Sequence, residues 1–177
     1  MKIFVIRHGE TDLNRAKILQ SQTEDGKLNA QGVAQAHASI GALPSGLTIC
    51  FSSPLTRARQ TAEIVAPHFK LPIIFCDELK EKHYGSLSGK PWDEVMKIMK
   101  HNLQDTNVKA DLTKYGGESV QDVNDRLTKF YTMLRQDYSQ EVPLIVAHDG
   151  IILLMHLLLK GRELAEVANA SVHEFEI

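Results

Sequence analysis

Short apolar segments alternate along this chain with longer segments of helical periodicity. The apolar segments have the character of buried strands, and they are Ile3–Ile6, Thr48–Phe51, Pro72–Phe75, Leu144–Ala147 and, more weakly, Val172–Glu176. The helical patterns between them cover Ala30–Leu43, Leu55–Ala66, Trp92–Leu103, Ser119–Gln136 and Ile151–Leu159. This alternation predicts an α/β fold, a three-layer α/β/α sandwich with a mostly parallel central sheet.

Capping residues predict where two of these helices begin. Ser53 followed by Pro54 is typical of an N-cap and a first helical position, so we expect the second helix to begin there. Ser119 with Asp122 three residues later resembles a capping box and predicts the start of the longest helix.

The length of 177 residues predicts a single domain over residues 1–177. Residues 102–117 form the longest stretch without clear periodicity. A stretch of this length inside a compact fold is more typical of an excursion or lid over a site than of a linker.

The overall charge and the apolar runs limit the location and the partners of the protein. A net charge of −2 and a pI near 6.4 argue against binding to nucleic acid or to an acidic membrane through bulk charge. The apolar runs are too short for a signal peptide or a bilayer span. Cys50 and Cys76 lie in apolar runs, as reduced buried thiols do. We therefore expect a cytoplasmic protein.

Two predicted strands end in a histidine. His8, preceded by Arg7, follows the first strand, and His148 follows the fourth. Ligands of open α/β sheets bind outside the carboxyl ends of the strands, so both imidazoles are expected at one rim. Arg57 falls in the first turn of a helix that follows a strand, where unpaired N–H groups and a guanidinium together favour an anion.

The loop "LKEKHYG" after the third strand adds Glu81 as an acid. Arginines, histidines and a carboxylate at one rim form a plausible site for phosphoryl transfer, which depends on positioning and on spreading the charge of the phosphoryl oxygens.

In this order the motifs resemble those of the histidine phosphatase superfamily, the phosphoglycerate mutase-like proteins. The resemblance rests on "RHGETDLN", "SSPLTRARQTA", "LKEKHYGSLSG", "GGES" and "AHDG", and it runs from residue 2 to about residue 173. It implies a role for each matched residue. His8 would be the nucleophile that becomes phosphorylated, and Glu81 would be the proton donor. The phosphoryl oxygens would be held by Arg7, Arg57 and His148, with Asn14 at the edge of the pocket.

Two positions depart from the family pattern. The family often has glycine after its second histidine, where this chain has Asp149. A carboxylate aimed at phosphate would repel it, so we expect Asp149 to turn away or to cap the following helix. The segment 20–32 matches loosely and is one residue longer, which leaves contacts from Gln20 and Ser21 as open questions.

Within the family, the resemblance implies either a phosphatase or a 2,3-bisphosphoglycerate-dependent phosphoglycerate mutase. "EKHYG" is close to the mutase form of the acid loop. The short chain, the lack of paired arginines in residues 102–117 and an end at Ile177 without a closing tail favour a phosphatase. We predict a phosphomonoester hydrolase that needs no metal or other cofactor.

Two other classes of protein are alternatives to this prediction. A metal enzyme built on His8, His83, His148 and Glu81 is disfavoured because arginines beside the ligands would repel a cation. An inactive module that binds a phospho-ligand or a partner protein is the third class, although the matched catalytic residues are all present. The expected partner is a small phosphorylated substrate or a phosphoprotein, and turnover of an aryl phosphate with and without chelator would separate the classes.

Overall fold

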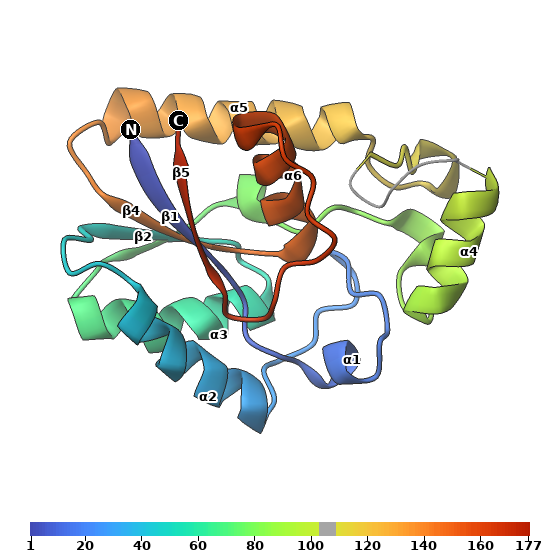
Figure 1. Ribbon diagram of the computed structural model, residues 1–177, viewed down its shortest axis with the longest axis horizontal. Coiled ribbons are helices and arrows are strands. Elements are labelled where there is room, and N and C mark those ends of the chain that lie inside the picture. Colours follow the sequence, from blue (N-terminus) through green and yellow to red (C-terminus); the bar gives the residue numbers. More distant parts are fainter. Residues whose placement is uncertain (103–108) are drawn as a thin grey trace.

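The computed structural model describes residues 1–102 and 109–177, and within these ranges five strands form one sheet (Figure 1). The strands are β1 (Lys2–Arg7), β2 (Ile49–Ser52), β3 (Ile73–Phe75), β4 (Pro143–Ala147) and β5 (Val172–Glu176). Their order across the sheet is β3-β2-β4-β1-β5, and only β5 runs antiparallel to its neighbour. The mostly parallel sheet predicted from the sequence is confirmed.

Helices follow the strands as the sequence pattern predicts, with one short helix that it does not predict. The helices are α1 (Asp12–Arg15), α2 (Ala30–Ser39), α3 (Thr56–Val65), α4 (Trp92–Asn102), α5 (Val120–Asp137) and α6 (Asp149–Lys160). Short 3-10 turns are η1 (Ile40–Ala42), η2 (Ala66–Phe69), η3 (Asp77–Leu79), η4 (Gly85–Leu87) and η5 (Thr113–Tyr115).

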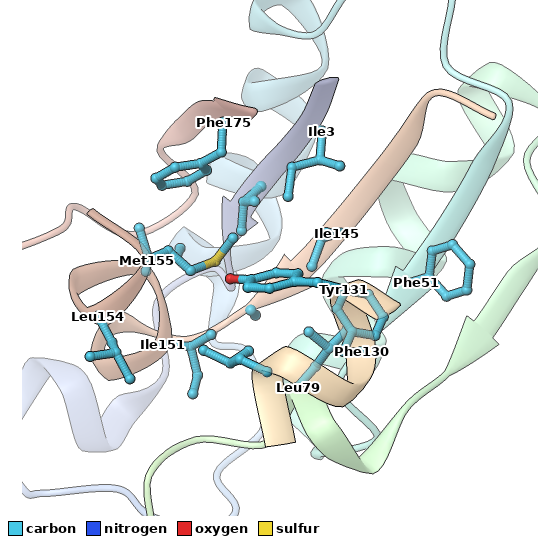
Figure 2. Close-up of a cluster of buried hydrophobic side chains, with 14 of the residues drawn as sticks. Ile3, Phe51, Leu79, Phe130, Tyr131, Ile145, Ile151, Leu154, Met155 and Phe175 are labelled. Carbon is cyan, nitrogen blue, oxygen red and sulfur yellow. The ribbon is translucent and has the colours of Figure 1, made fainter. Parts of the chain in front are cut away.

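Each face of the sheet carries its own hydrophobic core. Along β1, Ile3 and Val5 pack with α5 and α6, whereas Phe4 and Ile6 pack with α2 and α3. Successive side chains of a strand point to opposite faces, which explains this division. Figure 1 shows α2 and α3 below the sheet and α5 and α6 above it, and Figure 2 shows the α5–α6 core. The predicted three-layer sandwich is therefore confirmed.

Helix α4 lies apart from the two sheet cores (Figure 1). It buries Val95 and Met99 in a third apolar cluster, which also contains Leu19 and Leu112. The predicted excursion at 102–117 falls partly outside the described residues, which exclude 103–108. From residue 109 onward the chain returns to the third cluster, in which Ala110 is fully buried.

One predicted helix start is confirmed and the other is wrong. The Ser119 hydroxyl accepts a hydrogen bond from the Asp122 amide, and both halves of the capping box are formed. Helix α3 begins at Thr56, not beside Ser53, and its N-cap Leu55 gives no side-chain bond. The Ser53 hydroxyl accepts from the Leu55 amide at 3.3 Å just before the helix, and it also lies 2.8 Å from Nε2 of the His148 ring, so it takes part in a tertiary contact as well as in the local turn.

Within the described ranges, no helix is both long enough and apolar enough to cross a membrane.

Candidate active site

His8 and His148 lie side by side because their strands do. Arg7 at the end of β1 is in register with Ala147 at the end of β4, and the His8 amide donates to the Ala147 carbonyl at 3.0 Å. The ring centroids of the histidines are 5.2 Å apart. The prediction that both imidazoles meet at one rim is confirmed by this geometry.

The surroundings of His8 determine which ring nitrogen carries the proton. Nδ1 lies 2.7 Å from the Gly9 carbonyl, which can only accept, so Nδ1 is the protonated nitrogen. Nε2 accepts a hydrogen bond from Arg57 Nε at 3.2 Å and therefore presents a lone pair. Burial lowers the pKa of His8 well below its ordinary value, and the charges of Arg57 and Arg7 lower it further. The imidazole is neutral, as a nitrogen nucleophile must be.

Arg57 is buried, with 1% of its surface exposed, and is held on three sides. Besides His8, its guanidinium donates to the Ser21 carbonyl at 3.1 Å and to Asp25 Oδ1 at 3.2 Å. Asp25 also accepts from the Thr56 amide at the start of α3, at 2.8 Å. Asp25 was missed by the sequence analysis because its segment matches the family only loosely.

His148 is fully buried and is oriented by Ser53. Its Nε2 lies 2.8 Å from the Ser53 hydroxyl. That hydroxyl also accepts from the Leu55 amide at 3.3 Å. Burial lowers the pKa of His148 well below its ordinary value, and the charge of Arg57 lowers it further, so the neutral ring is favoured. Nδ1 has no hydrogen-bond partner among the described residues.

Arg7 and Asn14 line the same cavity as His8. Arg7 donates to the Val167 carbonyl through one terminal nitrogen, and its buried Nε has no partner among the described residues. Asn14 is the last position of the capping box of α1, where its Oδ1 accepts from the Thr11 amide at 3.1 Å. This box fixes the side chain of Asn14 at the cavity edge.

Glu81 is a buried acid in the loop after η3, and its side chain lies against the first turn of α6. Its carboxyl oxygens accept from the Lys82 amide at 2.7 Å and from the Gly150 amide at 3.2 Å. Burial raises the pKa of Glu81, and the nearby charge of Asp149 raises it further, against the two amides and Arg57. Burial is the largest of these influences, so the pKa of Glu81 is raised despite the nearby arginine.

Asp149 does not cap its helix, so that expectation is wrong. The residue lines the cavity, and its carboxylate accepts from the Val167 amide at 3.1 Å and lies 3.9 Å from an Arg7 nitrogen. The physical reason is that the Val167 amide, rather than an amide of its own helix, binds this carboxylate, with Arg7 nearby. Burial raises the pKa of Asp149, and Arg7 opposes this.

Gln20 also lines this cavity, although its contacts were an open question in the sequence. Its side chain is buried, and neither amide atom has a hydrogen-bond partner among the described residues. The cavity has a volume of about 770 Å³, within the usual range for sites of small molecules. An unsatisfied buried amide is costly, so its presence here points to a polar ligand.

His83 lies outside the cavity, in the loop that carries Glu81. Its Nδ1 accepts from the Gly85 amide at 3.1 Å, and its own amide donates to Glu118 at 2.8 Å. In the part of the chain that the structure describes, no group of three or more His, Cys, Asp or Glu side chains could hold a metal ion. His83 is therefore not placed with His8, His148 and Glu81 as the metal alternative requires.

An α/β sandwich that gathers two neutral histidines, two arginines and a buried acid at its strand ends defines a class of enzymes that transfer phosphoryl groups. The chain belongs to one family of that class. The family model described as "Histidine phosphatase superfamily (branch 1)" matches its residues 3–177.

Proteins named as phosphatases and proteins named as phosphoglycerate mutases are both similar to this chain. Phosphatase PhoE of Bacillus subtilis (strain 168), itself called uncharacterized, is 35% identical over 159 residues, which is 89% of this chain and 75% of PhoE. The probable phosphoglycerate mutase GpmB of Escherichia coli O1:K1 is 34% identical over 155 residues, 86% of this chain and 71% of GpmB. A mycobacterial glucosyl-3-phosphoglycerate phosphatase, solved with VO3, has a TM-score of 0.81 at 27% identity, covering 98% of this chain and 91% of its own. Phosphatase or mutase-like activity is supported.

Proposed function

We propose that the protein is a phosphomonoester hydrolase that works through a phosphohistidine on His8 and needs no metal. One observation carries the proposal: the Nε2 lone pair of a buried neutral imidazole lies against Arg57 at a cavity whose lining includes buried donors without partners among the described residues. These donors are Arg7 Nε and Gln20 Nε2. A phosphate dianion would satisfy such donors, and charge-assisted hydrogen bonds of this kind are strong.

In the first step, His8 Nε2 attacks the phosphorus of the substrate. The N–P bond forms, the ester P–O bond breaks, and Glu81 gives its proton to the departing oxygen. Arg57 Nε moves its hydrogen bond from His8 to a phosphoryl oxygen, while Arg7, Asn14 and His148 hold the others. The raised pKa of Glu81 supports this role because the acid must enter the step protonated.

In the second step, water replaces His8. A water molecule attacks the phosphorus, the N–P bond breaks, and the Glu81 carboxylate takes the proton of the water. The products are inorganic phosphate and the original neutral imidazole. Exposed residues line the mouth of the cavity, among them Lys17, Ala165 and Glu166, so water has a route to the phosphohistidine.

The second candidate is a phosphoglycerate mutase, which the name of GpmB favours. A mutase must keep water away from its phosphohistidine, and an open mouth works against that. The test is an assay with 3-phosphoglycerate and a bisphosphoglycerate primer. Inorganic phosphate without isomerised product is the expected result, and efficient isomerisation with little phosphate would establish the mutase instead.

The direct test is to trap the intermediate. Rapid quench with a ³²P-labelled ester should yield one acid-labile phosphoryl group per chain, and His8→Asn should abolish both the label and turnover. His68→Asn is the matched control because His68 is exposed on η2, away from the cavity. Turnover should be the same with and without EDTA. An acid-stable label, or full activity of His8→Asn, would reject the mechanism, and absence of turnover would support the inactive module.

Glu81 is tested through the leaving group. Glu81→Gln should slow cleavage of an alkyl phosphate by about 10²–10⁴-fold, the usual contribution of acid–base catalysis, and that of nitrophenyl phosphate far less, since nitrophenolate leaves without a proton. Glu78→Gln in the same loop is the control, because Glu78 lies outside the cavity. Equal slowing of both esters would limit Glu81 to binding or structure.

A further inference from the structure

The cavity is much larger than a phosphoryl group requires, and its lining residues fall into two groups of different chemistry. The first group, called the phosphoryl end here, comprises the charged and polar groups described above, around His8 and Arg57. The second group, called the second end, comes mainly from the loop after α1, helix α4 and the segment before β5. The chemistry of that second end decides which alcohol the phosphoryl group is attached to.

The walls of the second end are mostly apolar. Leu19 lines it from the loop after α1, and Trp92 and Met96 line it from successive turns of α4. Leu153 of α6 and Leu164 of the segment before β5 also line the cavity. Leu19 and Leu153 are buried, and the other three are half-buried, so this surface is fixed by the third cluster and the α5–α6 core.

The charged residues at this end are exposed and of both signs. Lys17 comes from the loop after α1 and Lys100 from α4, whereas Glu163 and Glu166 come from the segment before β5. Glu163 is also paired with Lys109. Among the described lining residues, no buried cation lies outside the phosphoryl end. A second phosphate or a carboxylate on the substrate would meet only solvent-screened lysines, whose attraction is weak.

We propose that the natural substrate is a monophosphate ester of a bulky, uncharged and largely apolar alcohol. The inference rests on the proposed function, since it places the phosphoryl group at His8 and the alcohol against Leu19, Trp92, Met96, Leu153 and Leu164. Burial of the apolar group against these walls supplies the binding free energy. The phosphoryl transfer itself is unchanged: the ester P–O bond breaks, and Glu81 protonates the alcohol oxygen.

The test compares esters whose leaving oxygens are alike. Ethyl phosphate, 3-phenylpropyl phosphate and glycerol 3-phosphate are all esters of primary alcohols, so differences in kcat/KM reflect binding of the alcohol part. We expect 3-phenylpropyl phosphate to exceed ethyl phosphate at least about tenfold, as apolar pockets discriminate. Glycerol 3-phosphate should not exceed ethyl phosphate. Equal kcat/KM for the three esters, or the highest for glycerol 3-phosphate, would overturn the inference.

A substitution ties the discrimination to the wall. Met96→Gln keeps the length of the side chain but places an amide in the apolar surface, and it should reduce the phenylpropyl-to-ethyl ratio about fourfold, roughly the value of one buried methylene group. Leu158→Gln puts the same amide on an exposed position of α6 that does not line the cavity, and it should keep the ratio. An unchanged ratio in Met96→Gln would contradict the placement of the alcohol.

A binding measurement separates this inference from the proposed function. The phosphonates matching the ethyl and phenylpropyl esters cannot be hydrolysed, and calorimetry should give the same order of affinity as kcat/KM. Preference for the phenylpropyl phosphonate without turnover of any ester would retain the apolar pocket and reject the hydrolase. Turnover of all three esters at equal rates, with equal phosphonate affinities, would retain the hydrolase and reject the apolar substrate.

Discussion

Two arginines of helix α3 have opposite surroundings. Arg57 is buried between His8, Ser21 and Asp25, whereas Arg59 is half-exposed and pairs with Glu63 across one turn. The planar fork of Arg57 has separate nitrogens for each of its partners. A lysine ammonium has the charge without this geometry, so the two residues are not equivalent here.

We expect Arg57→Lys to lower kcat/KM for a phosphate ester at least about tenfold, since hydrogen bonds to charged groups contribute roughly 1.5–3 kcal/mol each. Steady-state kinetics measures the loss, and thermal unfolding checks that the fold is retained. Arg59→Lys is the control on the same helix and should match the parent. Parent-like kinetics in Arg57→Lys would place Arg57 outside the reaction.

Asp149 offers a test of how the acid is tuned. Its negative charge raises the pKa of Glu81, so Asp149→Asn should lower that pKa. Glu81 must be protonated to act as the acid, and with a lower pKa it loses its proton at a lower pH. The alkaline limb of the pH profile of kcat/KM for an alkyl phosphate should therefore move to lower pH.

The exposed Asp137 gives the control variant Asp137→Asn, whose profile should match that of the parent. If Asp149→Asn lowers kcat/KM equally at every pH, Asp149 acts through Arg7 instead, to which it lies 3.9 Å distant.

At the scale of elements, strands and long helices could be predicted because their patterns are local. β1 is a continuous apolar run, and the Ser119 capping box is readable within four residues. Groups that serve a distant partner could not be predicted. Ser53 has the sequence context of a helix cap, but its hydroxyl contacts His148, 95 residues away. Helix α1 has only four residues and was missed, although Thr11 and Asn14 have capping-box spacing.

The same contrast between local sequence patterns and distant contacts decides which residues of the candidate site could be predicted. His8, Arg7, Arg57, Glu81 and His148 stand in recognisable motifs at element ends, and the structure brings them together. Asp25 and Gln20 lie in an irregular segment whose conformation is set by contacts with α3 and the acid loop, so no local pattern reveals them.

The capping box of α5 allows a stability prediction. Ser119→Ala removes the hydroxyl that accepts from the Asp122 amide at 3.1 Å, and it should lower the free energy of unfolding by about 1 kcal/mol, within the usual range for N-caps. Urea denaturation measures the change. Ser139→Ala alters an exposed serine beyond the end of the same helix and should leave the midpoint in place. Equal stability of the parent and Ser119→Ala would mean that Asp122 alone holds the helix start.

For the whole molecule, buried histidines link stability to pH. His156 Nε2 lies 3.0 Å from His173 Nδ1 between α6 and β5, and burial lowers the pKa of His156 to about 4. The unfolded chain binds this proton near pH 6.5. Protons therefore bind preferentially to the unfolded state between these values, and stability should fall as pH is lowered from about 6.5 to about 4.

Urea midpoints measured across this pH range should give a shallower slope for His156→Phe than for the parent, because one of the titrating groups has been removed. The absolute stability of the variant does not matter for this comparison. The control is His68→Phe, at an exposed histidine, and it should keep the parent slope. Identical slopes in all three proteins would exclude His156 as a source of the pH dependence.

The pairing of β1 with β4 has a consequence for how the protein is made. Phe4 is in register with Leu144, and the other neighbour of β1 is β5. On the ribosome, the apolar strand that leads to His8 emerges long before β4 and β5, so it must wait for more than 130 further residues before either neighbour exists. Contacts so distant in sequence slow folding and leave an unpaired strand open to aggregation. We therefore expect nascent chains that stop before β4 to depend on chaperones, with β1 as the bound segment.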